Sequence, residues 1–246
     1  MVRSVLLKRL LLVMGLLLVA LEVPAAETSL RGITLVYTEQ DATGESTTTR
    51  YFVNRDYLHI RESLSPRDFI LFDRKQQTIY IVTNSEKTIF VIGPKPVSIS
   101  PPIPLGFTET LDDGQTLPRI AGQEVHQYRF TANGELCYLA AVMTGETLAD
   151  AARALFEFKQ VMAGEHATTV GNIPPSMLNA CDLALNVFHA GQHLKHGVPV
   201  RESGAGAAPR YLQDFQLDGS LLAADIQLPV DYQRFSIGDN LIENAK

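Results

Sequence analysis

The stretch from Asp68 to Ile92, DFILFDRKQQTIYIVTNSEKTIFVI, has the most regular pattern in the chain. Three runs rich in Ile, Val, Phe and Tyr are separated by DRKQ at residues 73–76 and NSEK at residues 84–87. Turn-forming residues at this spacing predict a tight antiparallel meander of three strands at the centre of a sheet. The side chains that we expect on its inward face are Ile70, Phe72, Ile79, Ile81, Ile89 and Val91.

Further strand-like runs lie on both sides of this meander. We expect strands at residues 30–39, 47–53, 57–61, 123–130, 136–142, 211–217 and 221–228. The Asn133-Gly134 pair between two of these runs is typical of a two-residue hairpin turn. The prolines at residues 94–104 predict an extended surface connection that interrupts the sheet. Residues 202–208 are expected to form a flexible surface loop, and residues 218–220 a turn.

The pattern changes to a helical period after residue 146. Thr147 is the expected N-cap of a helix whose apolar residues recur at spacings of three and four and include Leu155 and Phe158. A second helix is expected to begin at Pro174 and to end before Gly197. Two or three helices packed on one face of a curved antiparallel sheet make an α+β fold, which is the predicted class.

Residues 1–25 have the parts of a secretory signal peptide. Three basic residues precede an apolar run at residues 10–21, and small residues at positions 23 and 25 fit cleavage after Ala25. A membrane anchor is the alternative, but this run is shorter than the roughly 20 residues that span a bilayer. We therefore expect residues 26–246 to form a single domain in the periplasm or outside the cell, with no stable membrane span after processing.

Charge and cysteine content narrow the function further. The whole chain has a formal charge of −6, and an acidic protein is a poor candidate for nucleic-acid binding. Cys137 and Cys181 follow the expected cleavage site, and two thiols in an oxidising compartment are most simply interpreted as one disulfide. Because Cys137 lies on an expected strand and Cys181 on an expected helix, the bond would join the sheet to the helices.

The candidate metal site is a group of three histidines near the end of the second expected helix. His189, His193 and His196 stand at i, i+4 and i+7, so one helical face could bind zinc or copper. The alternative is that they are polar surface residues in the last helical turns. The sequence contains no zinc-protease motif, no Gly-x-Ser-x-Gly elbow and no phosphate-binding glycine loop. We therefore expect neither an enzyme nor a bound cofactor.

Aromatic side chains are frequent on the predicted strands. A strongly curved sheet of this kind either encloses an apolar pocket or has its side chains packed as a solid core, and the sequence leaves both alternatives open. If a cavity exists, we expect it where the six inward residues of the meander meet Leu155 and Phe158 of the first helix.

Three segments resemble periplasmic domains of the lipoprotein-carrier (LolA-like) superfamily. They are YLHIR at residues 57–61, DFILFDR at residues 68–74 and QTIYIVTNSEKTI at residues 77–89. IAGQEVHQY at residues 120–128 is similar to the segment that opens the following hairpin in that group. The resemblance covers residues 30–142 and its motifs are structural. It implies a curved, incomplete antiparallel β-barrel with helices on its concave side, and apolar ligands such as acyl chains.

Three functions of different classes follow from these observations. The first is a soluble periplasmic binding or chaperone-like protein of the cell envelope that holds an acyl chain or lipid between sheet and helices. The second is a metal-binding envelope protein or enzyme that uses His189, His193 and His196. The third is an accessory module that binds another envelope protein through a sheet edge or the proline segment.

Overall fold

A computed structural model describes residues 28–40, 45–112, 114, 117–204 and 208–237, so the expected signal peptide lies outside the described residues. The described strands form one 12-stranded sheet in the order β12-β6-β5-β4-β3-β2-β1-β11-β10-β9-β8-β7. Neighbours are antiparallel except β12 and β6. The strands are β1 (Ser29–Gln40), β2 (Ser46–Val53), β3 (Tyr57–Glu62), β4 (Phe69–Asp73), β5 (Thr78–Thr83), β6 (Thr88–Ile92), β7 (Phe107–Leu111), β8 (Val125–Ala132), β9 (Glu135–Met143), β10 (Val198–Gly204), β11 (Arg210–Leu222) and β12 (Gln233–Phe235).

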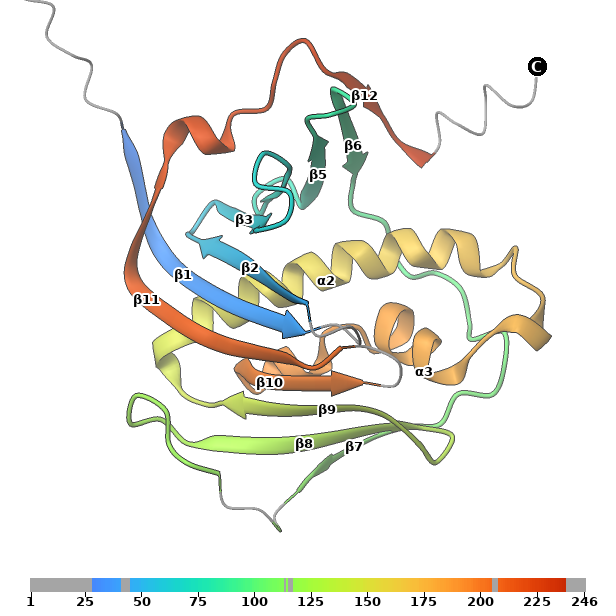
Figure 1. Cartoon of the computed structure of the whole chain (residues 1–246). Coiled ribbons are helices and arrows are strands. Elements are labelled where there is room, and N and C mark those ends of the chain that lie inside the picture. Colours follow the sequence, from blue (N-terminus) through green and yellow to red (C-terminus); the bar gives the residue numbers. More distant parts are fainter. Residues whose placement is uncertain (1–27, 41–44, 113, 115–116, 205–207, 238–246) are drawn as a thin grey trace, which may run out of the picture.

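The sheet curls around a long helix, which confirms the predicted α+β class (Figure 1). This helix consists of η1 (Glu146–Leu148) followed directly by α2 (Ala149–Val170). A second helical segment, α3 (Ala180–Leu183) followed by the π-helix η3 (Ala184–Phe188), packs beside it. The remaining short helices are η2 (Pro175–Met177), η4 (Gln192–Lys195) and η5 (Ala223–Ile226). Within the described ranges, no helix combines the length and the hydropathy needed to cross a membrane.

The meander of β4, β5 and β6 is confirmed, but the side chains of its last strand point to the opposite faces of the sheet from those expected. Phe72 pairs with Ile79 on the concave face, and Ile79 pairs with Ile92. Because side chains alternate along a strand, Phe90 and Ile92 face α2, whereas Ile89 and Val91 lie on the convex face. The four-residue turn that pairs Thr83 with Thr88 sets this register.

Two helix boundaries also differ from the sequence prediction. Thr147 lies inside η1 and does not act as the N-cap of the long helix. The segment from Pro174 forms only the single turn η2, and α3 begins later, where Asn179 Oδ1 accepts a hydrogen bond from the backbone N–H of Asp182 at 3.1 Å.

The C-terminal strands correct two further expectations. Residues 211–217 and 221–228 were expected to be two strands, but β11 runs through Gly219 without a turn because it pairs with β1 along most of its length. Residues 202–204 belong to strand β10, so they are not part of a flexible loop. The rest of that expected loop includes residues 205–207, which lie outside the described residues.

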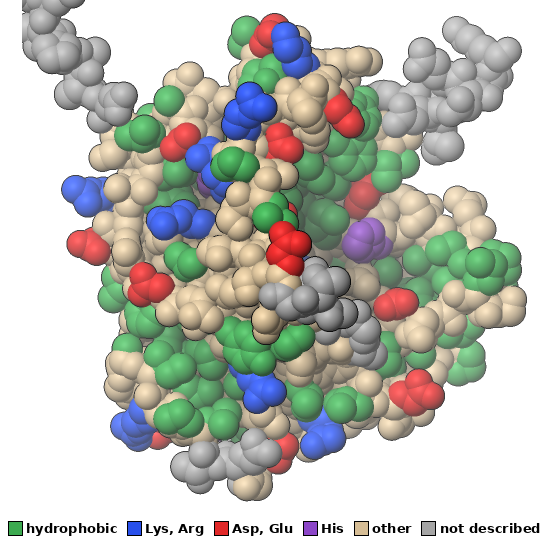
Figure 2. All heavy atoms as spheres, viewed as in Figure 1, with side chains coloured by type: hydrophobic (Ala, Val, Ile, Leu, Met, Phe, Trp, Pro, Cys, Tyr) green, Lys and Arg blue, Asp and Glu red, His purple; other side chains and the backbone are tan. Residues whose placement is uncertain are grey.

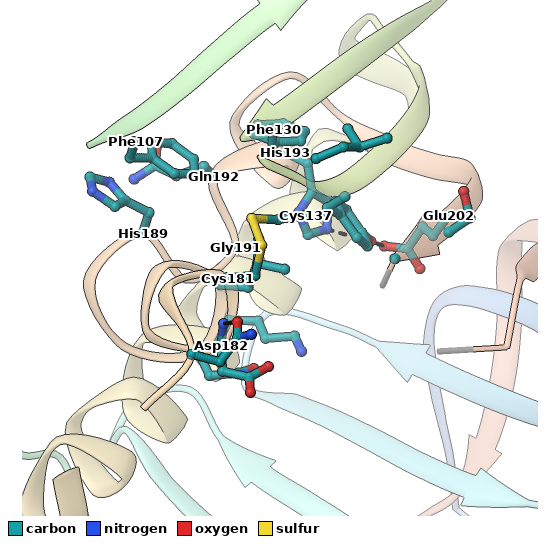
Figure 3. A pocket seen from close by; sticks show the side chains of 18 of the residues that line it. Phe107, Phe130, Cys137, Cys181, Asp182, His189, Gly191, Gln192, His193 and Glu202 are labelled. Atoms are coloured by element: carbon teal, nitrogen blue, oxygen red, sulfur yellow. Dashed lines mark hydrogen bonds and ion pairs between the residues drawn. A yellow bond between two sulfur atoms is a disulfide. The ribbon is translucent and has the colours of Figure 1, made fainter. Parts of the chain in front are cut away.

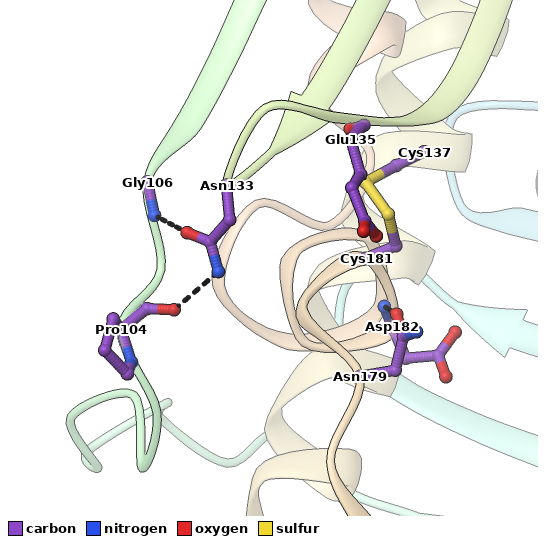
Figure 4. The surroundings of a disulfide bond; sticks show 8 residues. All are labelled: Pro104, Gly106, Asn133, Glu135, Cys137, Asn179, Cys181 and Asp182. Carbon is purple, nitrogen blue, oxygen red and sulfur yellow. Dashed lines mark hydrogen bonds between the residues drawn. A yellow bond between two sulfur atoms is a disulfide. The ribbon is translucent and has the colours of Figure 1, made fainter.

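The hairpin turn at Asn133-Gly134 is confirmed and has an additional role. Both residues have positive φ, as a two-residue type I′ turn requires. The amide of Asn133 accepts a hydrogen bond from the N–H of Gly106 at 2.8 Å and donates one to the carbonyl of Pro104 at 2.9 Å (Figure 4). The hairpin thereby holds the proline segment beside the sheet, just before β7.

The core fills the space between the concave face and α2. Its largest cluster includes Leu35, Leu58, Phe72, Ile79 and Leu155, each of which is at most 7% exposed. Acidic and basic side chains are interspersed over the face shown in Figure 2, which shows no continuous patch of either sign.

Candidate functional site

A pocket of about 530 Å³ lies where α3, η3 and η4 meet the strands β9, β10 and β11. This volume is within the range of small-molecule sites, which is about 300–1,000 Å³. Its lining combines rings, apolar groups and charged groups, among them Phe107, Phe130, Leu136, Tyr138, Lys159, Asp182, Leu185, His189, His193, Glu202 and Arg210. The π-helix η3 contributes Leu185 and Asn186, and such irregular turns are frequent at functional sites.

One wall of the pocket is apolar. Phe107 and Phe130 stack with their ring centroids 6.1 Å apart, and Leu136 and Leu185 line the same space. Figure 3 shows the Phe107 ring beside that of His189, with the disulfide between this pair and Glu202. The site therefore offers an apolar surface and a charged surface within one cavity.

The predicted disulfide between Cys137 and Cys181 is confirmed. It joins β9 to α3 with a Cα–Cα distance of 5.2 Å, and both cysteines are buried (Figure 4). Both also line the pocket, so the bond fixes α3 to the sheet at the site itself. A disulfide of this kind indicates an oxidising, extracytoplasmic compartment.

Glu202 is the centre of a buried polar network beside the pocket. It is only 6% exposed and lies on β10, opposite Arg210 on β11. Its carboxylate accepts hydrogen bonds from the hydroxyl of Tyr138 and from Nε of Arg210, the latter at 2.5 Å. Nε2 of His193 lies 3.2 Å from Oε1 of Glu202, the oxygen that also accepts the Tyr138 hydroxyl, whereas Arg210 donates to Oε2. A buried charge needs partners of this kind, because an unpaired one would carry a large desolvation cost.

Two tyrosines complete the surroundings of Arg210. Its Nη1 donates a hydrogen bond to the hydroxyl of Tyr51 at 2.8 Å, and its guanidinium lies 4.5 Å from the centroid of the Tyr37 ring. The hydroxyl of Tyr37 donates to the carbonyl of Pro199 at 2.8 Å. Arg210 is therefore held by an ion pair, a hydrogen bond and a cation–π contact at once.

The network shifts the pKa values of its members. Burial alone would raise the pKa of Glu202, but the hydrogen bond from His193 and the charge of Arg210 lower it from 4.5 to about 2. Burial, followed by the charge of Glu202, raises the pKa of Tyr138 and of Tyr37 well above the ordinary value. At neutral pH the network therefore contains one carboxylate, one guanidinium and protonated tyrosines.

Lys159 extends from α2 into the same pocket. Its side chain is accessible to solvent there, yet the surrounding protein desolvates the ammonium group and lowers its pKa below 10.5. Nearby Glu202 raises this pKa and Arg210 lowers it, both to a smaller extent. No hydrogen bond or ion pair joins Lys159 to another residue that the structure describes.

The three histidines of the candidate metal site are not brought together on one helical face. The helix ends at Phe188, where His189 leaves the helical conformation, and Gly191 then turns the chain with a left-handed φ of 70°. His189 stacks on Phe107, His193 lies at Glu202, and His196 stacks on Tyr128 and pairs with Glu109. The described part of the chain holds no group of three or more His, Cys, Asp or Glu residues that could bind a metal ion.

The expected apolar site lies elsewhere, and its side chains pack against one another. Phe72 meets Phe158 edge to face at 6.0 Å, Leu155 is 7% exposed, and Ile70, Ile79 and Ile81 belong to the same cluster. Ile89 and Val91 are on the convex face, as described above. None of these eight residues lines the 530 Å³ pocket.

Sequence reasoning missed Lys159, Glu202 and Arg210. The signal for Lys159 is its position one residue after Phe158, within the apolar stripe of the first helix. For Glu202 it is a carboxylate in a run, VPVRE, that begins with apolar residues and could form a strand. The glycines and alanines that follow favoured a loop there, and the pairing with Arg210 depends on the tertiary fold.

A second pocket, of about 390 Å³, lies at the start of the long helix. Its lining includes Gly145, Arg153, Phe156, Lys195 and His196. His196 is already paired with Glu109, and Lys195 lies over the ring of Phe156 at 5.6 Å. This pocket lacks the buried polar network of the first one.

Comparison with known proteins adds only a distant structural likeness. The structure of PNGF-II in a C2 space group has a TM-score of 0.44 and 10% identity, covering 87% of this chain and 32% of that one. The structure of PNGF-II in a P21 space group has a TM-score of 0.42 and 10% identity, covering 88% and 34%. The chain thus spans about a third of the length of those chains. No protein family and no curated protein matches the sequence.

Proposed function

We propose that the protein is an exported binding protein of the cell envelope, and that its ligand occupies the pocket beside the Cys137–Cys181 bond. The observation that carries this proposal is the lining of that pocket. A wall formed by Phe107, Phe130 and the disulfide faces the same space as a charged lysine. An apolar surface beside placed polar and charged groups in one cavity is a feature of small-molecule sites.

The proposed ligand is an acyl chain or a lipid, as the resemblance to lipoprotein carriers implies. Its location differs from the one expected from the sequence. The space between the meander and α2 is filled by its own side chains, such as Phe72 and Phe158, whereas the pocket at α3 is open. We therefore place the chain along Phe107, Phe130, Leu136 and Leu185.

A binding role agrees with the rigid construction of the site. The disulfide fixes α3 to β9, and the ion pair of Glu202 and Arg210 joins β10 to β11. A preformed pocket loses little conformational entropy when a ligand enters, which favours affinity. A periplasmic location agrees with the disulfide and with the expected signal peptide.

Titration calorimetry with dodecanoate as the probe tests this proposal. Leu185→Trp adds bulk to a half-buried residue that lines the pocket, and Leu222→Trp makes the same change at an exposed position outside it. We expect the wild-type protein and Leu222→Trp to bind the probe and Leu185→Trp to lose binding. Equal binding by all three proteins, or none by the wild type, would overturn the proposal.

A further inference from the structure

We infer that Lys159 binds the head group of the ligand, so that the pocket selects single-chain amphiphiles with an anionic head group. This inference rests on the proposed function and specifies its ligand class. It begins from the position of one cation in a cavity that also has an apolar wall.

The base of the Lys159 side chain is held in place. A Cβ added at Gly191 would lie 3.2 Å from the Cβ of Lys159 and 3.2 Å from the Phe156 ring, so the turn before η4 packs closely against α2. Gly191 and Lys159 both line the pocket. Packing thus constrains the Cβ of Lys159, and the side chain beyond it lines the cavity.

The two cations of the pocket differ in their partners. Arg210 is engaged by Glu202, by the Tyr51 hydroxyl and by the Tyr37 ring. Lys159 makes no hydrogen bond or ion pair within the described ranges. An ammonium group has three donors, so Lys159 is the group that a ligand can satisfy.

The electrostatic surroundings favour an anion at Lys159. Burial lowers the pKa of its ammonium group, which means that the neighbouring charges do not fully offset the hydration that the charged form loses. An anionic head group would supply that compensation in a partly desolvated space, where opposite charges attract more strongly than in water. The carboxylate of Glu202 is already neutralised by Arg210.

Other titratable groups also line the pocket. Asp182 and Glu135 are exposed, where solvent and salt screen their repulsion of an anion, and Glu39 lies 3.9 Å from Arg210. The remaining titratable side chains of the lining are His189, His193 and Tyr138.

The apolar wall is the reason that we assign the ligand an acyl chain in addition to an anionic head group. Phe107, Phe130, Leu136 and Leu185 line the same cavity as Lys159. A carboxylate, sulfate or phosphate head group at Lys159 would leave the chain to cover these side chains. Small inorganic anions would gain none of this apolar contact and are expected to bind weakly.

Three probes with the same chain length separate head-group charge from chain binding. They are dodecanoate, dodecanol and dodecylammonium, each titrated below the concentration at which it aggregates. We expect the wild-type protein to bind dodecanoate at least about tenfold more tightly than the other two, the typical value of one charged hydrogen bond. Lys159→Gln should abolish this preference. Lys195→Gln, which removes the same charge from the second pocket, should keep it.

The outcomes distinguish the inference from the proposed function. If the wild-type protein binds none of the three probes, both fail. If it binds all three alike, or if Lys159→Gln keeps the preference for dodecanoate, the inference is overturned while the proposed function stands.

A second measurement uses only the wild-type protein, in case the variant fails to fold. Because the pKa of Lys159 is lowered, a larger share of this side chain is neutral in alkaline buffer than for an ordinary lysine, and an anion that binds there should draw a proton onto it. Calorimetry in buffers of different ionisation enthalpy should therefore show proton uptake with dodecanoate and none with dodecanol. Binding of dodecanoate without proton uptake would overturn the inference.

Discussion

Glu202 and Arg210 face each other across β10 and β11 and form a buried ion pair, with Nε of Arg210 2.5 Å from a carboxylate oxygen of Glu202. Among the described residues, two register pairs join these strands, Arg201 with Tyr211 and Glu202 with Arg210. The ion pair therefore adds a side-chain link between β10 and β11 beside the pocket, where their backbone pairing is short.

Glu202→Gln should destabilise the protein strongly, because it leaves Arg210 buried without a counter-charge. Removing one partner of a buried pair lowers the free energy of unfolding by about 3–5 kcal/mol. Urea denaturation measures this difference. Glu124→Gln is the matched control, since Glu124 pairs with Arg119 on the surface and should cost at most about 1 kcal/mol. Equal losses in the two variants would contradict this interpretation of the network.

Acid should weaken the same contact in a defined range of pH. The pKa of Glu202 is lowered from 4.5 to about 2 in the folded protein, so its stabilising contribution is complete above 4.5 and is lost as the pH falls towards 2. In Glu202→Gln that contribution is missing at every pH. The wild-type melting temperature should fall more steeply than that of the variant below pH 4.5, and parallel curves would refute the assignment.

His59 should make stability depend on pH in a higher range than Glu202 does. Burial, followed by the charge of Arg61, lowers the pKa of this β3 histidine from 6.5 to about 4, and its Nε2 has no hydrogen-bond partner among the described residues. The unfolded chain takes up a proton first, so the wild type should lose stability as the pH falls from 6.5 to 4. His59→Leu should lose less over that interval in thermal denaturation. An unchanged slope would contradict the prediction.

The disulfide should contribute substantially to stability. Cys137 and Cys181 are 44 residues apart, and closing a loop of this length stabilises a fold by about 4 kcal/mol on the chain-entropy estimate. Replacing both cysteines by serine should lower the free energy of unfolding by roughly this amount. A reducing agent should destabilise the wild type and leave the double variant unaffected. If reduction leaves the wild type unchanged, the bond is not the constraint described above.

Gly164→Ala should destabilise the protein, although alanine favours helices. A Cβ at this position of α2 would lie 2.0 Å from the carbonyl oxygen of Lys95, where the connection after β6 crosses the helix (Figure 1). Gly171→Ala is the control, because nothing lies within 4 Å of its added Cβ and its φ is −63°. Chemical denaturation should show a loss only in the first variant, and the opposite ranking would contradict the packing.

Much of the fold could be predicted because its signals are local. The meander from Asp68 to Ile92 and the Asn133-Gly134 hairpin depend on alternation and on turn residues close in sequence. The prediction that Ile89 and Val91 point inward was wrong, because a shift of one residue in register moves every side chain of a strand to the other face of the sheet. Gly219 suggested a turn, but pairing of β11 with the distant β1 keeps it in a strand.

The site was less accessible to sequence reasoning than the fold. The pairing of Cys137 with Cys181 was predictable, because only two cysteines are present. The helical spacing of His189, His193 and His196 was misleading, since the left-handed turn at Gly191 separates them. The pocket is lined by residues of the strands β1, β7, β8, β9, β10 and β11 and of the helical segments α2, α3, η3 and η4. No local sequence pattern could predict that these distant segments meet.

A crystal structure of the protein with dodecanoate tests the central claim most directly. The account predicts density for the probe in the pocket beside the Cys137–Cys181 bond, with the carboxylate at Nζ of Lys159 and the chain against Phe107 and Phe130. Density for the chain between the meander and α2, beside Phe72 and Phe158, or at any other place outside this pocket, would contradict it.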